Sequence, residues 1–198
     1  IAKVDQKGGT GMSGTAIMQE STIFQTGVYS VADVLQRGNG NKSIINQNNE
    51  IMIGTKGNYA FVEQYGRENF SKVEQMNDAN LARTTQQGHG NKSITDQTSD
   101  MLSPSIIPSH FLQRSIVGQT GEFNYCRVTQ NGDNNLSTIT QDALCEGSAG
   151  DPWTNEALVL QTGELNFSSI NQMDAPLHDA NNYAKVTQTN DLGINALG

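Results

Sequence analysis

The sequence predicts an all-β fold: a β-solenoid of about seven strand-turn-strand rungs, with two parallel β-sheets face to face. Three observations support this fold class. Glutamine recurs every eleven residues over long stretches of the chain. The residues before each glutamine alternate with the period of two that is typical of a strand. Glycine or asparagine follows two residues after most of these glutamines, where a tight turn requires positive φ. Two strands and two turns make one rung of about 22 residues.

The glutamine period runs along most of the chain. Between most neighbouring glutamines lies the pattern Q-x-G-x-x-N-x-[AS]-x-x-x-Q. The step is eleven within each of four groups, and a final unit follows them: Gln25, Gln36 and Gln47; Gln64, Gln75, Gln86 and Gln97; Gln119, Gln130 and Gln141; Gln161 and Gln172; and Gln188. The unit ending at Gln25 is weaker than the rest, and one more weak unit, ending at Gln6, completes an expected set of fourteen strands.

The seven residues that end at each glutamine form the expected strand unit. Its first position is usually asparagine, at Asn41, Asn58, Asn69, Asn80, Asn91, Asn124, Asn135, Asn155, Asn166 and Asn182. The third position is small and the fifth is β-branched, as in Ala60 and Val62. These positions share one face with the glutamine, and the other face varies from unit to unit. We therefore expect the uniform face to lie between the two sheets.

The inward asparagines and glutamines require partners, because a buried amide without one costs about 2 kcal/mol or more. An amide stacked on an identical amide in the next rung donates one hydrogen bond and accepts another. Such ladders stabilise cross-β stacks. The polar interior therefore predicts that the rungs stack in register.

The turns divide into short and long links. The short ones carry Asn77 or one of the turn glycines Gly27, Gly38, Gly66, Gly88, Gly121, Gly132 and Gly163. Insertions lengthen the links near 7–18, 48–57, 98–112, 142–154 and 173–181, and these contain all four prolines, which a central strand excludes. We expect a single solenoid domain over residues 1–198 with these five insertions.

The composition excludes several functional classes. The formal net charge is −8, whereas a nucleic-acid binder normally has a basic surface. No apolar run reaches the length of a membrane span. His89, His110 and His178 fall in turns or long links without a second ligand at metal spacing. A serine or cysteine nucleophile would need a nearby histidine base, and Cys126 takes an inward position that packing explains. We therefore expect no nucleic-acid partner, no membrane insertion, no metal, no cofactor and no catalytic residue.

The two cysteines are Cys126 and Cys145. Cys126 takes the inward small position of its unit, whereas Cys145 follows Gln141 in a long link on the same side of the solenoid. The two lie about one rung apart by this placement. Both a disulfide bridge and a packed free thiol at Cys126 fit the sequence.

The repeat resembles that of the curlin family. The curlin repeat S-x5-Q-x-G-x-x-N-x-A-x3-Q is followed by Ser30, Gln36, Gly38, Asn41, Ser43 and Gln47, with serine in place of alanine. The resemblance implies a structural, non-enzymatic subunit of a curli-type fibre, a functional amyloid of the biofilm matrix. It also implies secretion to the bacterial cell surface and, as partners, a secretion channel and a nucleator subunit.

The ends of the chain show no charged or helical cap, which predicts head-to-tail stacking into a homopolymer. Two departures from the repeat, the insertions and the cysteines, leave open a nucleator or minor curlin subunit. A non-polymerising β-solenoid adhesin or ligand-binding module is the alternative from another class. It requires an outward face with one repeated residue type, and the outward positions vary. A parallel β-helix enzyme ranks third.

Overall fold

The structure is a computed structural model that describes residues 1–8, 18–27, 29–49, 57–77, 79–99, 113–143, 155–173 and 182–190. Most residues of the five predicted insertions lie outside these ranges. The described residues form fourteen strands: β1 (Ala2–Gly8), β2 (Glu20–Thr26), β3 (Val31–Asn39), β4 (Lys42–Asn48), β5 (Tyr59–Arg67), β6 (Phe70–Met76), β7 (Asn80–His89), β8 (Lys92–Thr98), β9 (Gln113–Glu122), β10 (Tyr125–Asn131), β11 (Asn135–Ala143), β12 (Asn155–Gly163), β13 (Phe167–Met173) and β14 (Asn182–Asn190).

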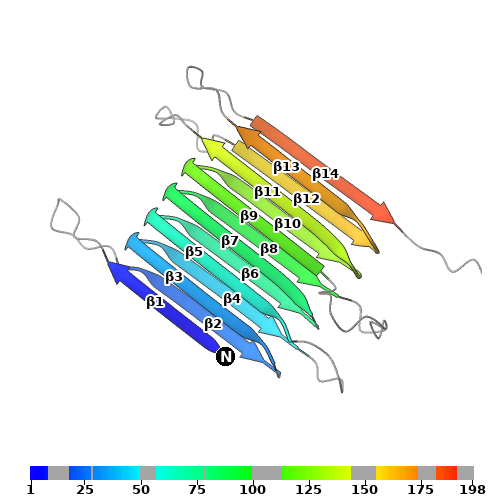
Figure 1. Cartoon of the computed structure of the whole chain (residues 1–198), viewed down its shortest axis with the longest axis horizontal. Coiled ribbons are helices and arrows are strands. Elements are labelled where there is room, and N and C mark those ends of the chain that lie inside the picture. The colour runs from blue at the N-terminus through cyan, green and yellow to red at the C-terminus, as the bar shows by residue number, and fades with distance from the viewer. Residues whose placement is uncertain are drawn as a thin grey trace, which may run out of the picture.

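The strands alternate between two parallel sheets of seven strands each. The odd sheet has the order β1-β3-β5-β7-β9-β11-β13, and the even sheet has the order β2-β4-β6-β8-β10-β12-β14. Figure 1 shows the two sheets lying one over the other, with the strands stacked in the order of the sequence. Each odd strand and the even strand that follows it form one rung. The predicted all-β solenoid of about seven rungs is confirmed.

The rungs stack in register, so that identical residues pair along each sheet. Gln36 of β3 pairs with Gln64 of β5, which pairs with Gln86 of β7. In the even sheet, Gln47 pairs with Gln75. Because the side-chain period is two, this register places the glutamine that ends each repeat unit on the inner face. The repeat therefore becomes a set of columns that run along the stack.

The strands extend further than the sequence pattern indicates. We expected each strand to end at its glutamine, but β3 continues past Gln36 to Asn39 and β5 continues past Gln64 to Arg67. The turn glycines Gly38 and Gly66 pair within this extension. The turns of successive rungs therefore stack on each other with the same parallel pairing as the strands. A pattern of alternating side chains carries no signal for this extension, because it depends on the neighbouring rung.

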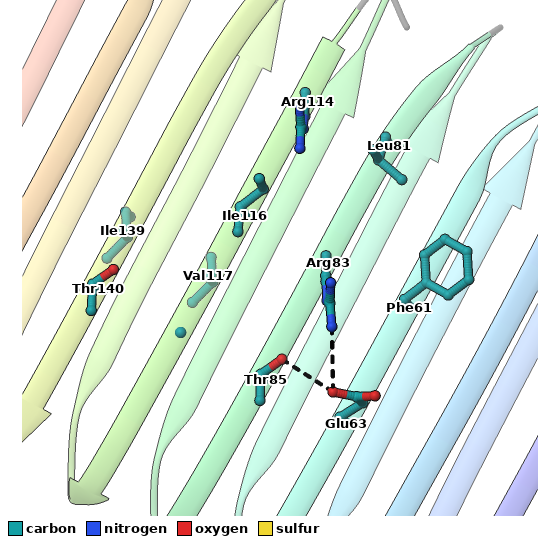
Figure 2. Close-up of a pocket in the computed structure, with 11 residues that line it drawn as sticks. Phe61, Glu63, Leu81, Arg83, Thr85, Arg114, Ile116, Val117, Ile139 and Thr140 are labelled. Atoms are coloured by element: carbon teal, nitrogen blue, oxygen red, sulfur yellow. Dashed lines mark hydrogen bonds and ion pairs between the residues drawn. The ribbon is translucent and has the colours of Figure 1, made fainter.

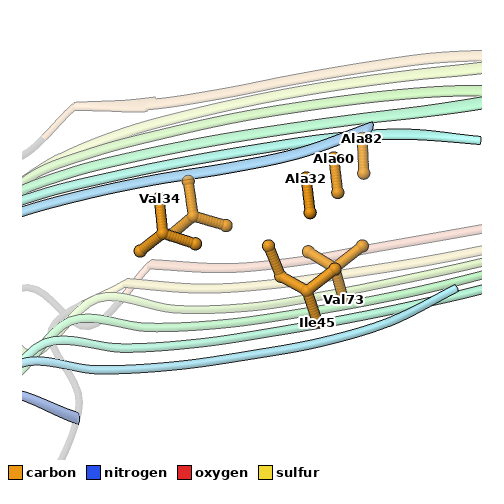
Figure 3. Close-up of a cluster of buried hydrophobic side chains, with 7 residues drawn as sticks. Ala32, Val34, Ile45, Ala60, Val73 and Ala82 are labelled. Carbon is orange, nitrogen blue, oxygen red and sulfur yellow. The ribbon is translucent and has the colours of Figure 1, made fainter. Parts of the chain in front are cut away.

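The apolar interior is a thin layer between the sheets. In Figure 3, Ala32, Val34, Ala60 and Ala82 of the odd sheet point toward Ile45 and Val73 of the even sheet. A second apolar cluster lies further along the stack and includes Val117, Val128, Ile139 and Val159. Thr84 of β7 and Thr95 of β8 occupy the equivalent positions in the fourth rung, between the two clusters. Both threonines are buried, and neither hydroxyl has a hydrogen-bond partner.

Thr84→Val and Thr95→Val are each expected to raise the free energy of unfolding by about 1 kcal/mol. Valine keeps the β-branched shape and removes a buried hydroxyl that makes no hydrogen bond. The urea midpoint of the soluble chain, followed by circular dichroism, measures the effect. Thr85→Val is the matched control, because the Thr85 side chain faces outward and its hydroxyl donates to Glu63 at 3.4 Å. Equal effects at all three positions would contradict this explanation.

Candidate functional site in the amide ladders and the end rungs

Two ladders of glutamine side chains run through the whole stack, one on the inner face of each sheet. In every step, Nε2 of one glutamine donates to Oε1 of the next at 2.7 to 2.9 Å. The odd ladder contains Gln6, Gln36, Gln64, Gln86, Gln119, Gln141 and Gln172, and the even ladder contains Gln25, Gln47, Gln75, Gln97, Gln130, Gln161 and Gln188.

The second Nε2 proton bonds across the interior to the opposite sheet. Gln64 donates to the backbone carbonyl of Lys42 at 3.1 Å, and Gln86 donates to that of Phe70 at 2.9 Å. These side chains are fully buried. The glutamines therefore join the rungs along the stack and the two sheets across it. This double pairing removes most of the cost of placing amides in the interior.

Asparagine ladders run beside the turns. In the even sheet, Nδ2 donates to Oδ1 of the preceding rung at 2.9 to 3.2 Å through Asn41, Asn69, Asn91, Asn124, Asn155 and Asn182. Asn69 Nδ2 also donates to the turn carbonyls of Tyr65 and Gly88, both at 3.1 Å. Asn69 thus joins the start of β6 to two stacked turns by hydrogen bonds. In the odd sheet, the ladder forms two separate pairs, Asn58 with Asn80 and Asn135 with Asn166.

The ladders give the stack a direction. Glutamine Nε2 donates toward the C-terminal rung, as from Gln64 to Gln86. Asparagine Nδ2 donates toward the N-terminal rung, as from Asn91 to Asn69. The two faces of a rung are therefore chemically different, with glutamine donors on one and asparagine donors on the other. Two rungs continue the ladders when they stack in the same direction.

Gln113 interrupts the odd asparagine ladder. It takes the first position of its unit, where asparagine is usual, and it is fully buried between Asn80 and Asn135. Its Nε2 donates to the carbonyls of Thr98 and Gly132. Its own Oε1 and Asn80 Oδ1 are left without partners. The list of ladder residues predicted from the sequence omitted this position, although its place six residues before Gln119 identifies it.

Gln113→Asn is expected to raise the free energy of unfolding by about 1–3 kcal/mol. The shorter amide matches the side chains above and below it, which restores a donor to Asn80 Oδ1, and a buried acceptor without a partner costs about that much. Asparagine also reaches the turn carbonyl, as Asn135 does with Gly163 at 2.9 Å. Urea unfolding of the soluble chain measures the change.

Asn91→Gln is the reciprocal variant, because it introduces the same mismatch into the unbroken even ladder. We expect it to lower stability. If Gln113→Asn and Asn91→Gln both stabilise the chain, or if neither does, the mismatch between amides of different length does not determine stability at these two positions.

The turn glycines are required for two reasons. Gly38, Gly66 and Gly88 adopt φ of 111°, 105° and 120°, which favours glycine. A Cβ on Gly66 would also lie 2.1 Å from the carbonyl oxygen of Gly88 in the next rung. The other turn glycines have the same positive φ and the same close approach to the rung above: Gly27, Gly121, Gly132 and Gly163. Sequence reasoning identified the turn requirement and missed the contact between rungs.

A second position with positive φ lies four residues after the glutamine and was not predicted. It is glycine at Gly40 and Gly90. It is another residue in six turns, at Tyr29, Glu68, Ala79, Phe123, Asn134 and Leu165. Because the side chain varies, the sequence carried no glycine signal at this position. Each short turn that the structure describes therefore reverses the chain with two left-handed residues.

The end rungs are the least covered parts of the interior. Val4 of β1 is 46% exposed, whereas Val34 at the same position of β3 is 0% exposed. At the other end, Ala184 and Val186 of β14 are only partly buried against the apolar cluster. Among the described residues, β1, β2, β13 and β14 each pair with one neighbour. Each end therefore presents a strand edge and the partly exposed inner residues of a rung.

The structure places Cys126 in the interior as a free thiol. Its Sγ donates to Ser93 Oγ at 3.4 Å, and burial raises the pKa of the thiol to about 12. As a thiol, Cys126 is therefore protonated at neutral pH. Cys145 lies outside the described residues, so the Cys126–Cys145 bridge stays a prediction.

The described histidine, His89, is the last residue of β7. It contacts Glu68 at 3.1 Å and packs edge-on against Phe123. His110 and His178 lie outside the described residues. Within the described ranges, no group of three or more His, Cys, Asp or Glu side chains is arranged to hold a metal ion. The same ranges contain no helix long and apolar enough to span a membrane.

Comparison with known proteins gives one result. The model of the curlin associated repeat matches residues 116–142, which cover β10 and most of β9 and β11. This match supports the resemblance to the curlin family that the sequence motif indicates. No match was found among curated proteins or among solved structures.

Proposed function

We propose that this chain, which carries a curlin associated repeat at residues 116–142, is a structural subunit of an extracellular curli-type fibre. The subunits stack head to tail, and each one extends the two sheets of the next. The observation that carries the proposal is the match between the two end rungs. A stack whose ends resemble its interior grows through a contact that does not close.

The inward residues of the end rungs fit each other in the register of the interior. When Gln172 of one copy pairs with Gln6 of the next, Ile170 falls opposite Val4 and Ser168 falls opposite Ala2. In the even sheet, Gln188 falls opposite Gln25. Val186 and Ala184 then fall opposite Ile23 and Ser21. Each pair repeats a contact type already present between rungs, such as Ile139 with Ile170.

The direction of the ladders favours head-to-tail over head-to-head stacking. In the interior, each glutamine Nε2 donates to Oε1 of the following rung. With Gln172 and Gln188 below Gln6 and Gln25 of the next copy, this order continues across the contact. A head-to-head contact reverses the strand direction and places like groups of the amides against each other. It therefore loses both the parallel pairing and the ladders.

The family resemblance adds to the proposal where the chain is exported and where it assembles. A curli-type subunit is secreted through an outer-membrane channel, assembles on a nucleator subunit at the bacterial surface and contributes to the biofilm matrix. A structural role without catalysis belongs to the same proposal. These steps rest on the family resemblance, whereas the stacking rests on the strands and ladders of this chain.

Electron microscopy and fibre diffraction of the purified chain test the proposal. We expect unbranched fibres with a reflection near 4.7–4.8 Å along the fibre axis, which is the spacing of stacked strands. A chain that stays monomeric at high concentration and gives no such reflection is not a fibre subunit. A monomeric adhesin or ligand-binding module then becomes the better account.

A further inference from the structure

We propose that the outer face of the odd sheet binds a small acid with an apolar body, in a hollow that Gly118 helps to line. The hollow has a volume of about 590 Å³, which is within the range of small-molecule sites. It lies across β5, β7, β9 and β11 and is lined by Phe61, Leu81, Arg83, Arg114 and Ile116, among others (Figure 2). This proposal is independent of fibre assembly.

The absence of a side chain at Gly118 leaves one part of the hollow open. Gly118 takes an outward position on β9 and pairs with Thr85 of β7 and Thr140 of β11. A Cβ built on Gly118 meets nothing within 4 Å. The neighbouring outward side chains therefore stand around an open space above the sheet.

Two guanidinium groups border this space. Arg114 is paired with Leu81, and Arg83 is paired with Ile116, so that the arginines occupy diagonal positions on neighbouring strands. Such positions are about 7–8 Å apart, within reach of two long side chains. Arg83 lies 3.8 Å from Glu63 and is largely exposed. Arg114 makes no ion pair within the described part of the chain.

The charge around the hollow is therefore not balanced locally. Glu63 is the one carboxylate among the lining residues, against two guanidinium groups. Like charges on neighbouring strands repel, and a carboxylate held by both arginines relieves that repulsion. The chain as a whole has a formal net charge of −8, so this small cationic area differs from its surroundings. A single negative charge on the ligand completes the balance.

The apolar lining specifies the rest of the ligand. Phe61, Leu81 and Ile116 are half-buried and surround the arginines with apolar surface. An alkyl or aromatic body covers this surface, whereas a polyanion places further charges against it and against Glu63. The chemistry therefore indicates a monocarboxylic acid with an apolar chain, such as a fatty acid of medium length.

Equilibrium dialysis of decanoate against the full chain tests the site, because it counts bound ligand whether or not the chain has assembled. We expect saturable binding of one decanoate per chain. Arg114→Gln should weaken the binding by roughly tenfold or more, since it removes a charge-assisted hydrogen bond. The uncharged analogue 1-decanol should bind the original chain more weakly by a similar factor.

Two further variants make the test specific. Gly118→Leu fills the hollow and should abolish binding, and the urea midpoint of this variant confirms that it folds. Arg127→Gln removes an arginine from the even sheet, where Arg127 pairs with Asp96 at 3.3 Å, and should leave binding unchanged. Absence of saturable binding, equal binding by the Arg114→Gln variant, or equal affinity for 1-decanol overturns the proposal. It is also overturned if Arg114→Gln alters side-by-side association of the chains but not decanoate binding.

Discussion

Gly88→Ala is expected to lower the free energy of unfolding by about 2–6 kcal/mol. Alanine at φ of 120° is strained by about 1–3 kcal/mol, and its Cβ would lie 2.0 Å from the carbonyl oxygen of Gly121. Relief of that overlap requires the turns of the fourth and fifth rungs to separate, which costs roughly a further 1–3 kcal/mol. The urea midpoint of the soluble chain, at a concentration where it does not scatter light, measures the change.

Gly118→Ala is the matched control for this substitution. Gly118 lies in a strand, its φ is not positive, and a Cβ there meets nothing within 4 Å. We expect Gly118→Ala to be neutral or slightly stabilising, because alanine restricts the unfolded chain. A similar loss of stability in both variants would mean that glycine is needed for a reason other than contact between rungs.

Gln86→Leu is expected to lower the free energy of unfolding by about 3 kcal/mol or more. Gln86 accepts from Gln64 at 2.8 Å and donates to Gln119 at 2.8 Å and to the carbonyl of Phe70 at 2.9 Å. Leucine has a similar size but makes no hydrogen bonds. It leaves Gln64 Nε2, Gln119 Oε1 and the carbonyl of Phe70 without the bond to Gln86, each at a cost of about 1–3 kcal/mol. The gain from burying an apolar side chain offsets only part of that cost.

Gln87→Leu, one residue along the chain, is the control. It makes the same change of residue type at a glutamine that is not part of the ladder. Gln87 is exposed on the outer face, and its substitution is expected to change stability by less than about 0.5 kcal/mol. Urea unfolding of the two variants under the same conditions compares them directly. If Gln86→Leu is as mild as Gln87→Leu, the glutamine ladder is not a main stabilising feature of the stack.

Much of the fold can be predicted from the sequence because one rung repeats. In this parallel in-register stack, most inward side chains meet the same or a similar residue type above and below them. The period that places Gln64 and Gln86 in equivalent units therefore also identifies them as neighbours. The two faces could be told apart because the inward face, with residues such as Val62 and Ala60, stays constant while the outward face varies.

Features that depend on contact between rungs could not be predicted in the same way. The extension of β3 and β5 through their turns needs a neighbouring turn to pair with. The close approach of Gly66 to Gly88 depends on the spacing of the stack. The second left-handed turn position carries residues as different as Glu68 and Leu165, so the residue type gives no signal for it. The ladder break at Gln113 has a sequence signal, but its two unpartnered oxygens appear only in three dimensions.

Disulfide trapping between two single-cysteine variants tests head-to-tail stacking most directly. In a background of Cys126→Ala and Cys145→Ser, one variant carries Lys3→Cys and the other carries Ser169→Cys. The end rungs align these outward positions on adjacent strands when Gln172 pairs with Gln6, at a spacing close to that of a disulfide. The two variants are assembled separately and as a mixture, and are then oxidised mildly.

The head-to-tail account predicts covalent dimers from the mixture and few from either variant alone. With both substitutions in one chain, it predicts a series of covalent multimers. Dimers formed by the Lys3→Cys variant alone or by the Ser169→Cys variant alone would indicate contact between like ends. That result, or assembled fibres from the mixture with no covalent dimer, would contradict the account.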